Sequence, residues 1–199
     1  MQIANPIKAL NHLFISKVRI KVLKYYLFNA DIPIHLRGLV REVQEEINAV
    51  RRELLRLEEI GLIRSEMRGN RKYYLLNRDF LYVNELLGIF HKSFGLGGSI
   101  IKNLENLGKV DFAILTGSFT TFSAPDPNII DLVLIGDIDL QALSKLVQDA
   151  EKKLNREINY TVLKSSEFIL KKKRRDAFIM QLLIVPKIML CGNINDLST

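Results

Sequence analysis

Arginine and asparagine side chains recur at helical spacing on one side of the segment 45–60. At about 100° per residue, the other side of a helix here carries an apolar stripe, made up of Ile47, Val50, Leu54 and Leu57. The polar side carries Glu45, Asn48, Ala49, Arg52 and Arg56. In a major groove, Asn pairs bidentately with adenine and Arg with guanine, whereas Arg51 and Arg56 are more naturally placed to meet phosphates. These residue types at this spacing predict a surface that binds DNA.

A second basic cluster follows shortly after this segment. It surrounds Gly69 and consists of Arg68, Asn70, Arg71 and Lys72. At the tip of a hairpin, such side chains are positioned to touch the DNA backbone or to enter the minor groove. The alternative is that the charges only solvate a helix and a loop, as charge runs usually do. The order of the elements favours the DNA interpretation.

Five elements must position these side chains. Helices are predicted over 16–28, 35–43 and 45–60, and the last ends at Gly61. Strands are predicted over 62–67 and 72–76, and we expect Gly69 and Asn70 to supply the positive φ of a tight hairpin. A short helix, a tight turn, an arginine-bearing helix and a basic hairpin within roughly 60 residues predict a winged helix-turn-helix domain over residues 1–79.

Three segments of this region, 36–42, 48–62 and 69–77, carry a resemblance to a known family. Over residues 15–79 the chain resembles prokaryotic winged helix-turn-helix regulators of the ArsR-like type. The resemblance implies double-stranded DNA as the partner. Readers of this kind are commonly homodimers, which place two recognition helices about 34 Å apart on a palindromic site. The metal-sensing cysteines of some of these regulators are absent here, so a thiolate metal sensor is not expected.

The rest of the chain has a different pattern. A connecting helix over 80–94 leads into the glycine cluster 95–99, and we expect residues 80–98 to form a linker helix and a hinge. Beyond it, strands are predicted over 110–115, 130–135 and 158–163, a helix over 140–154, and two helices within 166–183. This alternation predicts a mixed α/β sheet domain over 99–199, and therefore an α+β chain of two domains.

Gly117 and Ser118 end the first of these strands, and Asp131 follows fourteen residues after Gly117. This pattern resembles the nucleotidyltransferase superfamily, whose signature is Gly-Ser at a strand-to-helix turn and Asp-x-Asp on the next strand. The resemblance implies phosphates at the Gly-Ser backbone and Mg²⁺ on the paired carboxylates, completed by a third carboxylate. However, Ile129 occupies the position of the first aspartate, and near the third position only Glu157 is acidic, beside Asn159.

One carboxylate cannot orient two Mg²⁺ ions, so we expect this domain to be catalytically inactive. No catalytic residue, metal or cofactor is expected, and a vestigial nucleotide site comprises Gly117, Ser118 and Asp131. It would hold a nucleotide weakly, by backbone amides. Asp137 and Asp139 form another Asp-x-Asp, but Asp139 is better placed to cap the helix that begins at Leu140.

Both halves together resemble a prokaryotic regulator family that fuses a winged helix-turn-helix to a nucleotidyltransferase-like domain. The resemblance implies a DNA-binding transcriptional regulator whose C-terminal domain makes ligand or partner contacts. Two alternatives remain. One is an active metal-dependent nucleotidyltransferase that the winged helix targets, and the other is a protein-interaction module such as an antitoxin-like partner.

Composition and charge agree with a nucleic-acid partner. The net charge is +7, from 29 Lys and Arg against 22 Asp and Glu, and residues 1–95 hold 16 of the basic and 10 of the acidic groups. The run 171–175 is basic as well, but a solvated helix surface explains it. A single cysteine, Cys191, the lack of a secretory signal and the lack of a long apolar run favour the cytoplasm and no membrane partner.

Overall fold

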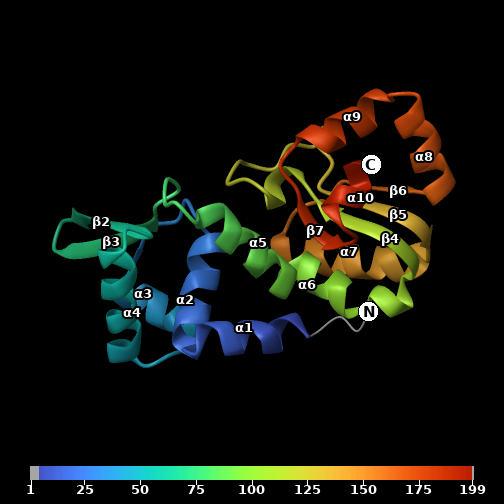
Figure 1. Ribbon diagram of the computed structural model, residues 1–199. Coiled ribbons are helices and arrows are strands. Elements are labelled where there is room, and N and C mark those ends of the chain that lie inside the picture. Colours follow the sequence, from blue (N-terminus) through green and yellow to red (C-terminus); the bar gives the residue numbers. More distant parts are fainter. Residues whose placement is uncertain (1–4, 199) are drawn as a thin grey trace. The chain divides into compact units, whose positions relative to one another are not determined.

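The computed structural model describes residues 5–198, whose contacts divide the chain into two compact units, 5–90 and 91–198. The N-terminal unit contains α1 (Pro6–Phe14), α2 (Lys17–Phe28), β1 (Ile34–His35), α3 (Leu36–Val43), α4 (Ile47–Glu59), β2 (Ile63–Arg68) and β3 (Arg71–Leu76) (Figure 1). Its antiparallel sheet has the order β1-β3-β2. Helices α3 and α4 with the β2–β3 hairpin have the element order of a winged helix-turn-helix.

Side chains at the helix ends explain where α3 and α4 begin. His35 Nδ1 accepts a hydrogen bond from the Gly38 amide, and the Glu46 carboxylate accepts from the amides of the first turn of α4. These bonds satisfy amides that have no partner within the helix, and they lower the pKa of Glu46. Between the helices, Gln44 adopts a left-handed conformation, with φ of 53°, and so makes the tight turn.

The wing hairpin has a two-residue turn, because Arg68 pairs directly with Arg71. Gly69 has a φ of 59°. Asn70 is not among the described residues with positive φ, so the expectation that both turn residues have positive φ is wrong for Asn70. A positive φ at the first turn residue alone is the pattern of a type II′ turn, whose twist matches that of the two strands.

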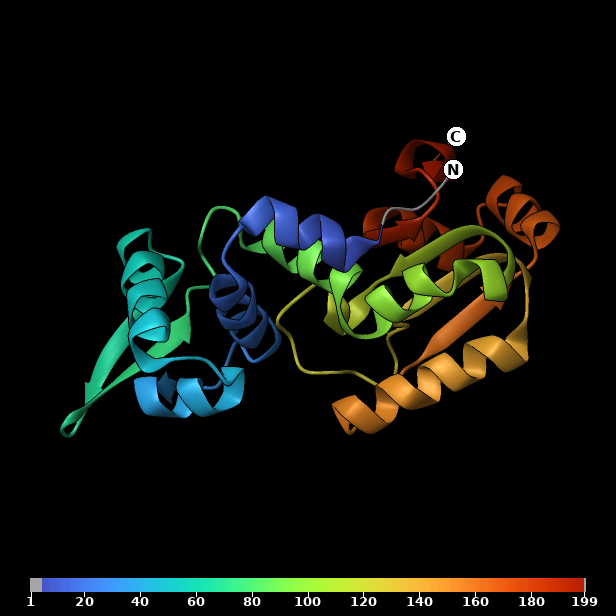
Figure 2. The same cartoon turned by 90° about the horizontal axis from the view of Figure 1, so that it is seen from below.

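The C-terminal unit is built around a mixed sheet of order β6-β5-β4-β7 (Figures 1 and 2). Its strands are β4 (Gly108–Leu115), β5 (Leu132–Ile138), β6 (Tyr160–Leu163) and β7 (Ile188–Cys191). Its α-helices are α6 (Gly95–Lys102), α7 (Leu140–Leu154), α8 (Ser165–Lys173), α9 (Ala177–Ile184) and α10 (Ile194–Ser198), and α5 (Val83–Ser93) spans the division between the units. Only β5 and β6 are parallel.

Apolar side chains cover both faces of this sheet. Leu132 and Leu134 pack with residues of α6 and α7, whereas Val133 and Ile135 pack with residues of α8 and α9. Because successive strand residues point to opposite faces, β5 reads as a continuous apolar run. The predicted helix over 140–154 is confirmed as α7, and the Asp139 carboxylate accepts from the Gln141 and Ala142 amides as its cap.

Several features differ from the sequence-based expectation. The structure adds α1, β1, β7 and α10, which were not predicted. It also places the glycine cluster 95–99, which was predicted as a hinge, in the first turns of α6, where Gly97 and Gly98 are buried. A Cβ on Gly97 would lie 2.3 Å from the His91 carbonyl oxygen, so these glycines permit close packing of the backbone. Among residues 5–198, no helix is long and apolar enough to cross a membrane.

Candidate nucleic-acid interface

The second helix of the helix-turn-helix, α4, presents the predicted polar face. Asn48, Arg51 and Arg52 are exposed, and Ala49 is half-buried. Val50, Leu54 and Leu57 of the opposite stripe are buried in the core. Glu45 precedes α4 rather than belonging to it, and its carboxylate lies 2.6 Å from Lys21 Nζ. This carboxylate is therefore paired within the protein.

The arginines of α4 fall into two groups. Arg51 and Arg52 form no ion pair with any residue in the described range 5–198. Arg56 donates from Nη1 to Glu53 Oε1 at 3.2 Å. Glu53 is only 4% exposed and also accepts from Arg19 Nε at 2.8 Å. Arg56 is thus held against a buried carboxylate, while Arg51 and Arg52 are available to a partner.

Sequence reasoning missed Glu53. It sits beside Val50, Leu54 and Leu57, on the edge of the apolar stripe. Burying an unpaired carboxylate costs free energy of folding, so the position of Glu53 in the sequence was a signal for basic partners nearby.

At the wing, two of the three predicted cations are engaged within the hairpin region. Arg68 pairs with Glu66, and Lys72 Nζ lies 2.8 Å from Glu58 Oε2. The Lys72–Glu58 hydrogen bond raises the pKa of Lys72 and lowers that of Glu58. Arg71 is exposed beside Asn70 and has no ion pair with the part of the chain that the structure describes.

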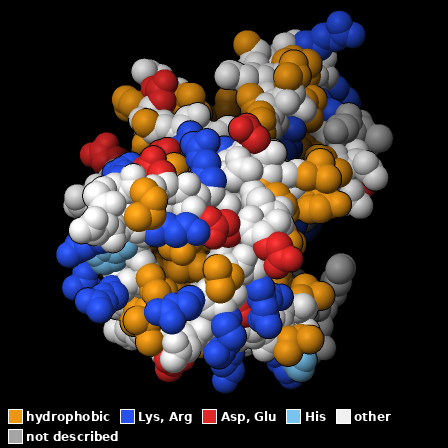
Figure 3. Space-filling view, turned by 90° about the vertical axis from the view of Figure 1, so that its left-hand side faces the viewer, with side chains coloured by type: hydrophobic (Ala, Val, Ile, Leu, Met, Phe, Trp, Pro, Cys, Tyr) orange, Lys and Arg blue, Asp and Glu red, His pale blue; other side chains and the backbone are white. Residues whose placement is uncertain are grey.

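On the face that Figure 3 shows, Lys and Arg side chains do not gather into a single patch. Figure 3 presents the side on which the β2–β3 hairpin lies in Figure 1, and Lys and Arg side chains are spread over it with acidic and hydrophobic groups between them. Exposed cations of α4 and of the wing, Arg51, Arg52 and Arg71, belong to one compact unit. A polyanion that contacts both elements would meet several unpaired guanidinium groups.

In the C-terminal unit, the three residues of the expected vestigial nucleotide site lie together. Ser118 Oγ donates to Asp131 Oδ1 at 2.8 Å, and Asp131 is only 4% exposed. Arg156 completes the cluster, which the sequence did not predict. Its Nη1 lies 2.8 Å from Asp131 Oδ2, its Nη2 donates to Ser118 Oγ at 2.7 Å, and its guanidinium lies over the Phe119 ring.

This arrangement departs from the expected phosphate and metal site in two ways. First, Gly117 opens a single 3-10 turn, Gly117–Phe119, and no α-helix follows it before β5, so the expected helix N-terminus is wrong. Second, Asp131 immediately precedes β5 instead of lying within it, and its carboxylate is already neutralised by Arg156. A carboxylate held by a guanidinium is a poor cation ligand.

The other positions of the resemblance do not supply the missing carboxylates. Ile129 is 47% exposed, and Asn159 Nδ2 donates to the backbone carbonyls of Pro127 and Ile129. Glu157 is exposed, and only its backbone carbonyl contacts Arg156. Within residues 5–198, no group of three or more His, Cys, Asp or Glu side chains is arranged to hold a metal ion.

Comparisons with known proteins find partial likenesses of fold. No family model and no curated protein matches the chain. MepR, a transcription regulator of the Staphylococcus aureus multidrug efflux pump MepA, is similar with a TM-score of 0.40 and 17% identity, over 52% of this chain and 74% of MepR. Human N-acetylserotonin methyltransferase, solved with SAM, is similar with a TM-score of 0.31 and 12% identity, over 61% of this chain but only 37% of the enzyme.

Proposed function

We propose that this protein binds double-stranded DNA through α4 and the β2–β3 wing and thereby regulates transcription. The observation that carries the proposal is the exposed face of α4, where Asn48, Arg51 and Arg52 stand on the second helix of a helix-turn-helix. In this arrangement the second helix enters the major groove. Asn48 and Arg52 then read base edges, and Arg51 meets phosphates.

The wing supplies a further contact to the DNA backbone. Arg71 at its tip is exposed and unpaired among the described residues. It can therefore bind a phosphate without first breaking an ion pair within the protein. Lys72 must first exchange Glu58 for a phosphate. We infer further that two copies bind a palindromic site, with recognition helices about 34 Å apart.

For the C-terminal unit we propose a role in ligand or partner contacts without nucleotidyl transfer. The Arg156–Asp131 ion pair supports this proposal. Asp131 is the carboxylate that matches the second aspartate of the metal-binding pattern, and Arg156 already neutralises it. Incubation with labelled nucleoside triphosphates, Mg²⁺ or Mn²⁺ and cell extract should give no labelled product. Label transfer that Asp131→Ala abolishes would show an active enzyme instead.

Selection of bound sequences from a random DNA library tests the proposed function directly. We expect the full chain to enrich one sequence with two-fold symmetry. The triple variant Arg51→Ala/Arg52→Ala/Arg71→Ala should enrich none, whereas Arg174→Ala, which removes an exposed arginine of the other unit, should enrich the same sequence as the unaltered chain. Failure of the unaltered chain to enrich any sequence would refute sequence-specific binding.

A further inference from the structure

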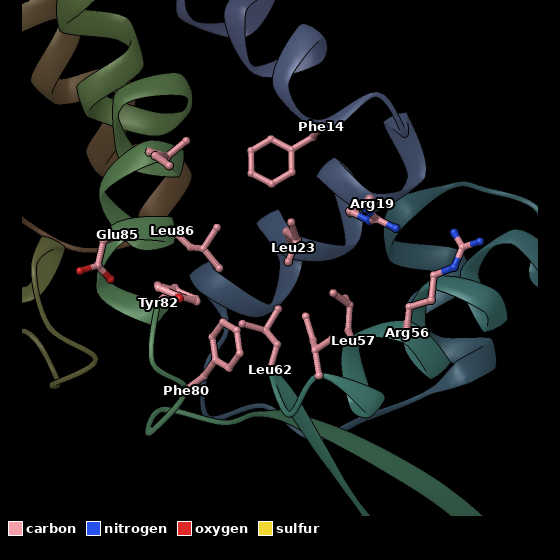
Figure 4. A pocket seen from close by; sticks show the side chains of 12 residues that line it. Phe14, Arg19, Leu23, Arg56, Leu57, Leu62, Phe80, Tyr82, Glu85 and Leu86 are labelled. Carbon is pink, nitrogen blue, oxygen red and sulfur yellow. The ribbon is translucent and has the colours of Figure 1, made fainter.

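The N-terminal unit contains an apolar cavity of about 470 Å³ (Figure 4). It is lined by aliphatic side chains of α2, α4 and α5 and by the rings of Phe14, Phe80 and Tyr82. Its size falls in the range of roughly 300–1,000 Å³ that is typical of small-molecule sites, which are mostly apolar with a few charged groups. The space is large enough for a flat ring system against these aromatic side chains.

The charged groups of the cavity lie at separate ends. Arg19 and Arg56 stand on one side in Figure 4, and Glu85 stands on the other. Both arginines share a single carboxylate, that of buried Glu53, to which each donates one hydrogen bond. Two guanidinium groups against one carboxylate leave one positive charge uncompensated at this end.

The two guanidinium groups also have donors to spare. An arginine carries about five N–H donors, and neither side chain donates to any acceptor other than Glu53 among residues 5–198. Guanidinium groups bind carboxylates and similar anions in a planar, bidentate manner. The arginine end is therefore built to accept an anion next to an apolar space.

We propose that this cavity binds a small molecule with a flat apolar body and one anionic group, which contacts Arg19 and Arg56. The aromatic rings pack against the body of the ligand, and the anion neutralises the excess charge beside Glu53. A cation at the same end would face two guanidinium groups, so lipophilic cations are disfavoured there.

The ligand would also act on DNA binding, an inference that rests on the proposed function. Arg56, Leu57 and Ile60 line the cavity and lie on α4 or at its end, whose other face carries Arg51 and Arg52. A ligand that alters the packing of α4 changes the affinity for DNA, and DNA then changes the affinity for the ligand by the same factor. Binding to the cavity itself does not require DNA.

Calorimetric titration of the full chain with 2-naphthoate, without DNA, tests the cavity. We expect saturable binding that Arg56→Gln weakens about ten-fold, as for the loss of one charged hydrogen bond. The matched variant Arg64→Gln, outside the cavity, should leave the affinity unchanged. Neutral 2-naphthylmethanol should bind more weakly than 2-naphthoate and should not respond to Arg56→Gln. Equal affinity for the two compounds, or no saturable binding of either, would overturn the proposal.

A second variant keeps the test independent of the arginines. Ile89 lines the cavity and is 37% exposed, so Ile89→Trp should fill the space and abolish naphthoate binding. Ile169→Trp, at an exposed position in the other unit, serves as the matched control. Circular dichroism should show both variants folded, and sedimentation should show an unchanged mass. If Ile89→Trp separates a dimer, the cavity is a contact between copies and the proposal is wrong.

Discussion

At the scale of single residues, arginines one turn apart on α4 have different surroundings. Arg52 is exposed and unpaired within the described residues, whereas Arg56 is bound to buried Glu53. The sequence placed both on the DNA-facing side, because spacing gives the direction of a side chain but not its partners. Whether a guanidinium is available depends on a carboxylate that only the tertiary structure brings close, as with Arg19 and Glu53.

Arg52→Ala should weaken binding to the selected DNA sequence by about 1–3 kcal/mol and relax the preference at one base position. The reason is the loss of a bidentate contact to a base. Fluorescence anisotropy with the selected sequence and with a scrambled one measures the effect. Arg174→Ala, at an exposed position of the other unit, is the control. Equal losses on both sequences would mean that Arg52 contacts only phosphates.

Arg156→Met should destabilise the C-terminal unit by about 3 kcal/mol, because it leaves the buried Asp131 carboxylate without its cation. Urea unfolding followed by circular dichroism measures the change. The double variant Asp131→Asn/Arg156→Met should recover part of the loss, since the unpaired charge is then gone. Lys153→Met, at an exposed position of α7, is the control. A loss below about 0.5 kcal/mol would place the pair among ordinary surface ion pairs.

At the scale of elements, the amphipathic helices and the hairpin were predictable, because their periodicity and turn residues are local signals. β7 was not, since residues 177–191 form one apolar stretch in which α9 and β7 look alike until Pro186 separates them. Asn5 followed by Pro6 was a usable signal for α1, as a cap and a first-turn proline. The glycine cluster 95–99 was read as a hinge, but glycine permits close helix packing as well as flexibility, and here it lies in α6.

The wing should contribute to DNA binding chiefly through Arg71. Arg71→Ala should reduce the slope of log affinity against log salt by about 1, the value for one phosphate contact. Lys72→Ala should reduce it less, because Lys72 is already paired with Glu58. Anisotropy titrations over a range of salt concentrations give both slopes. An unchanged slope for Arg71→Ala would show that the tip of the wing does not touch DNA.

At the start of α6, the backbone of Gly97 lies close to the His91 carbonyl group. Gly97→Ala should lower stability by about 1–3 kcal/mol, because the new methyl group would meet the His91 carbonyl oxygen at 2.3 Å. Thermal unfolding measures the loss. Ser99→Ala, two residues further along the same helix, should have little effect. Equal stability of Gly97→Ala and the unaltered chain would favour a flexible segment here after all.

At the scale of the whole molecule, each unit has its own core. The buried residues of the N-terminal unit, such as Val22, Leu39 and Leu54, belong to neither of the two clusters that cover the C-terminal sheet. A fragment of residues 1–94 should therefore fold alone and bind DNA with the salt slope of the full chain. Circular dichroism and anisotropy test this. An unfolded fragment would show that the units depend on each other for stability.

The pairing of β7 with β4 also bears on how the protein is made. All elements of the N-terminal unit precede residue 94, whereas the C-terminal sheet needs β7, which ends at Cys191. At about 5–20 residues per second, the ribosome needs several seconds more to supply that strand. During this interval the β4 edge has no partner, and exposed strand edges invite pairing with other chains. The nascent chain thus passes through a stage in which the N-terminal unit is complete while the C-terminal sheet still has an unpaired strand edge, and this is the stage at which chaperones would matter most.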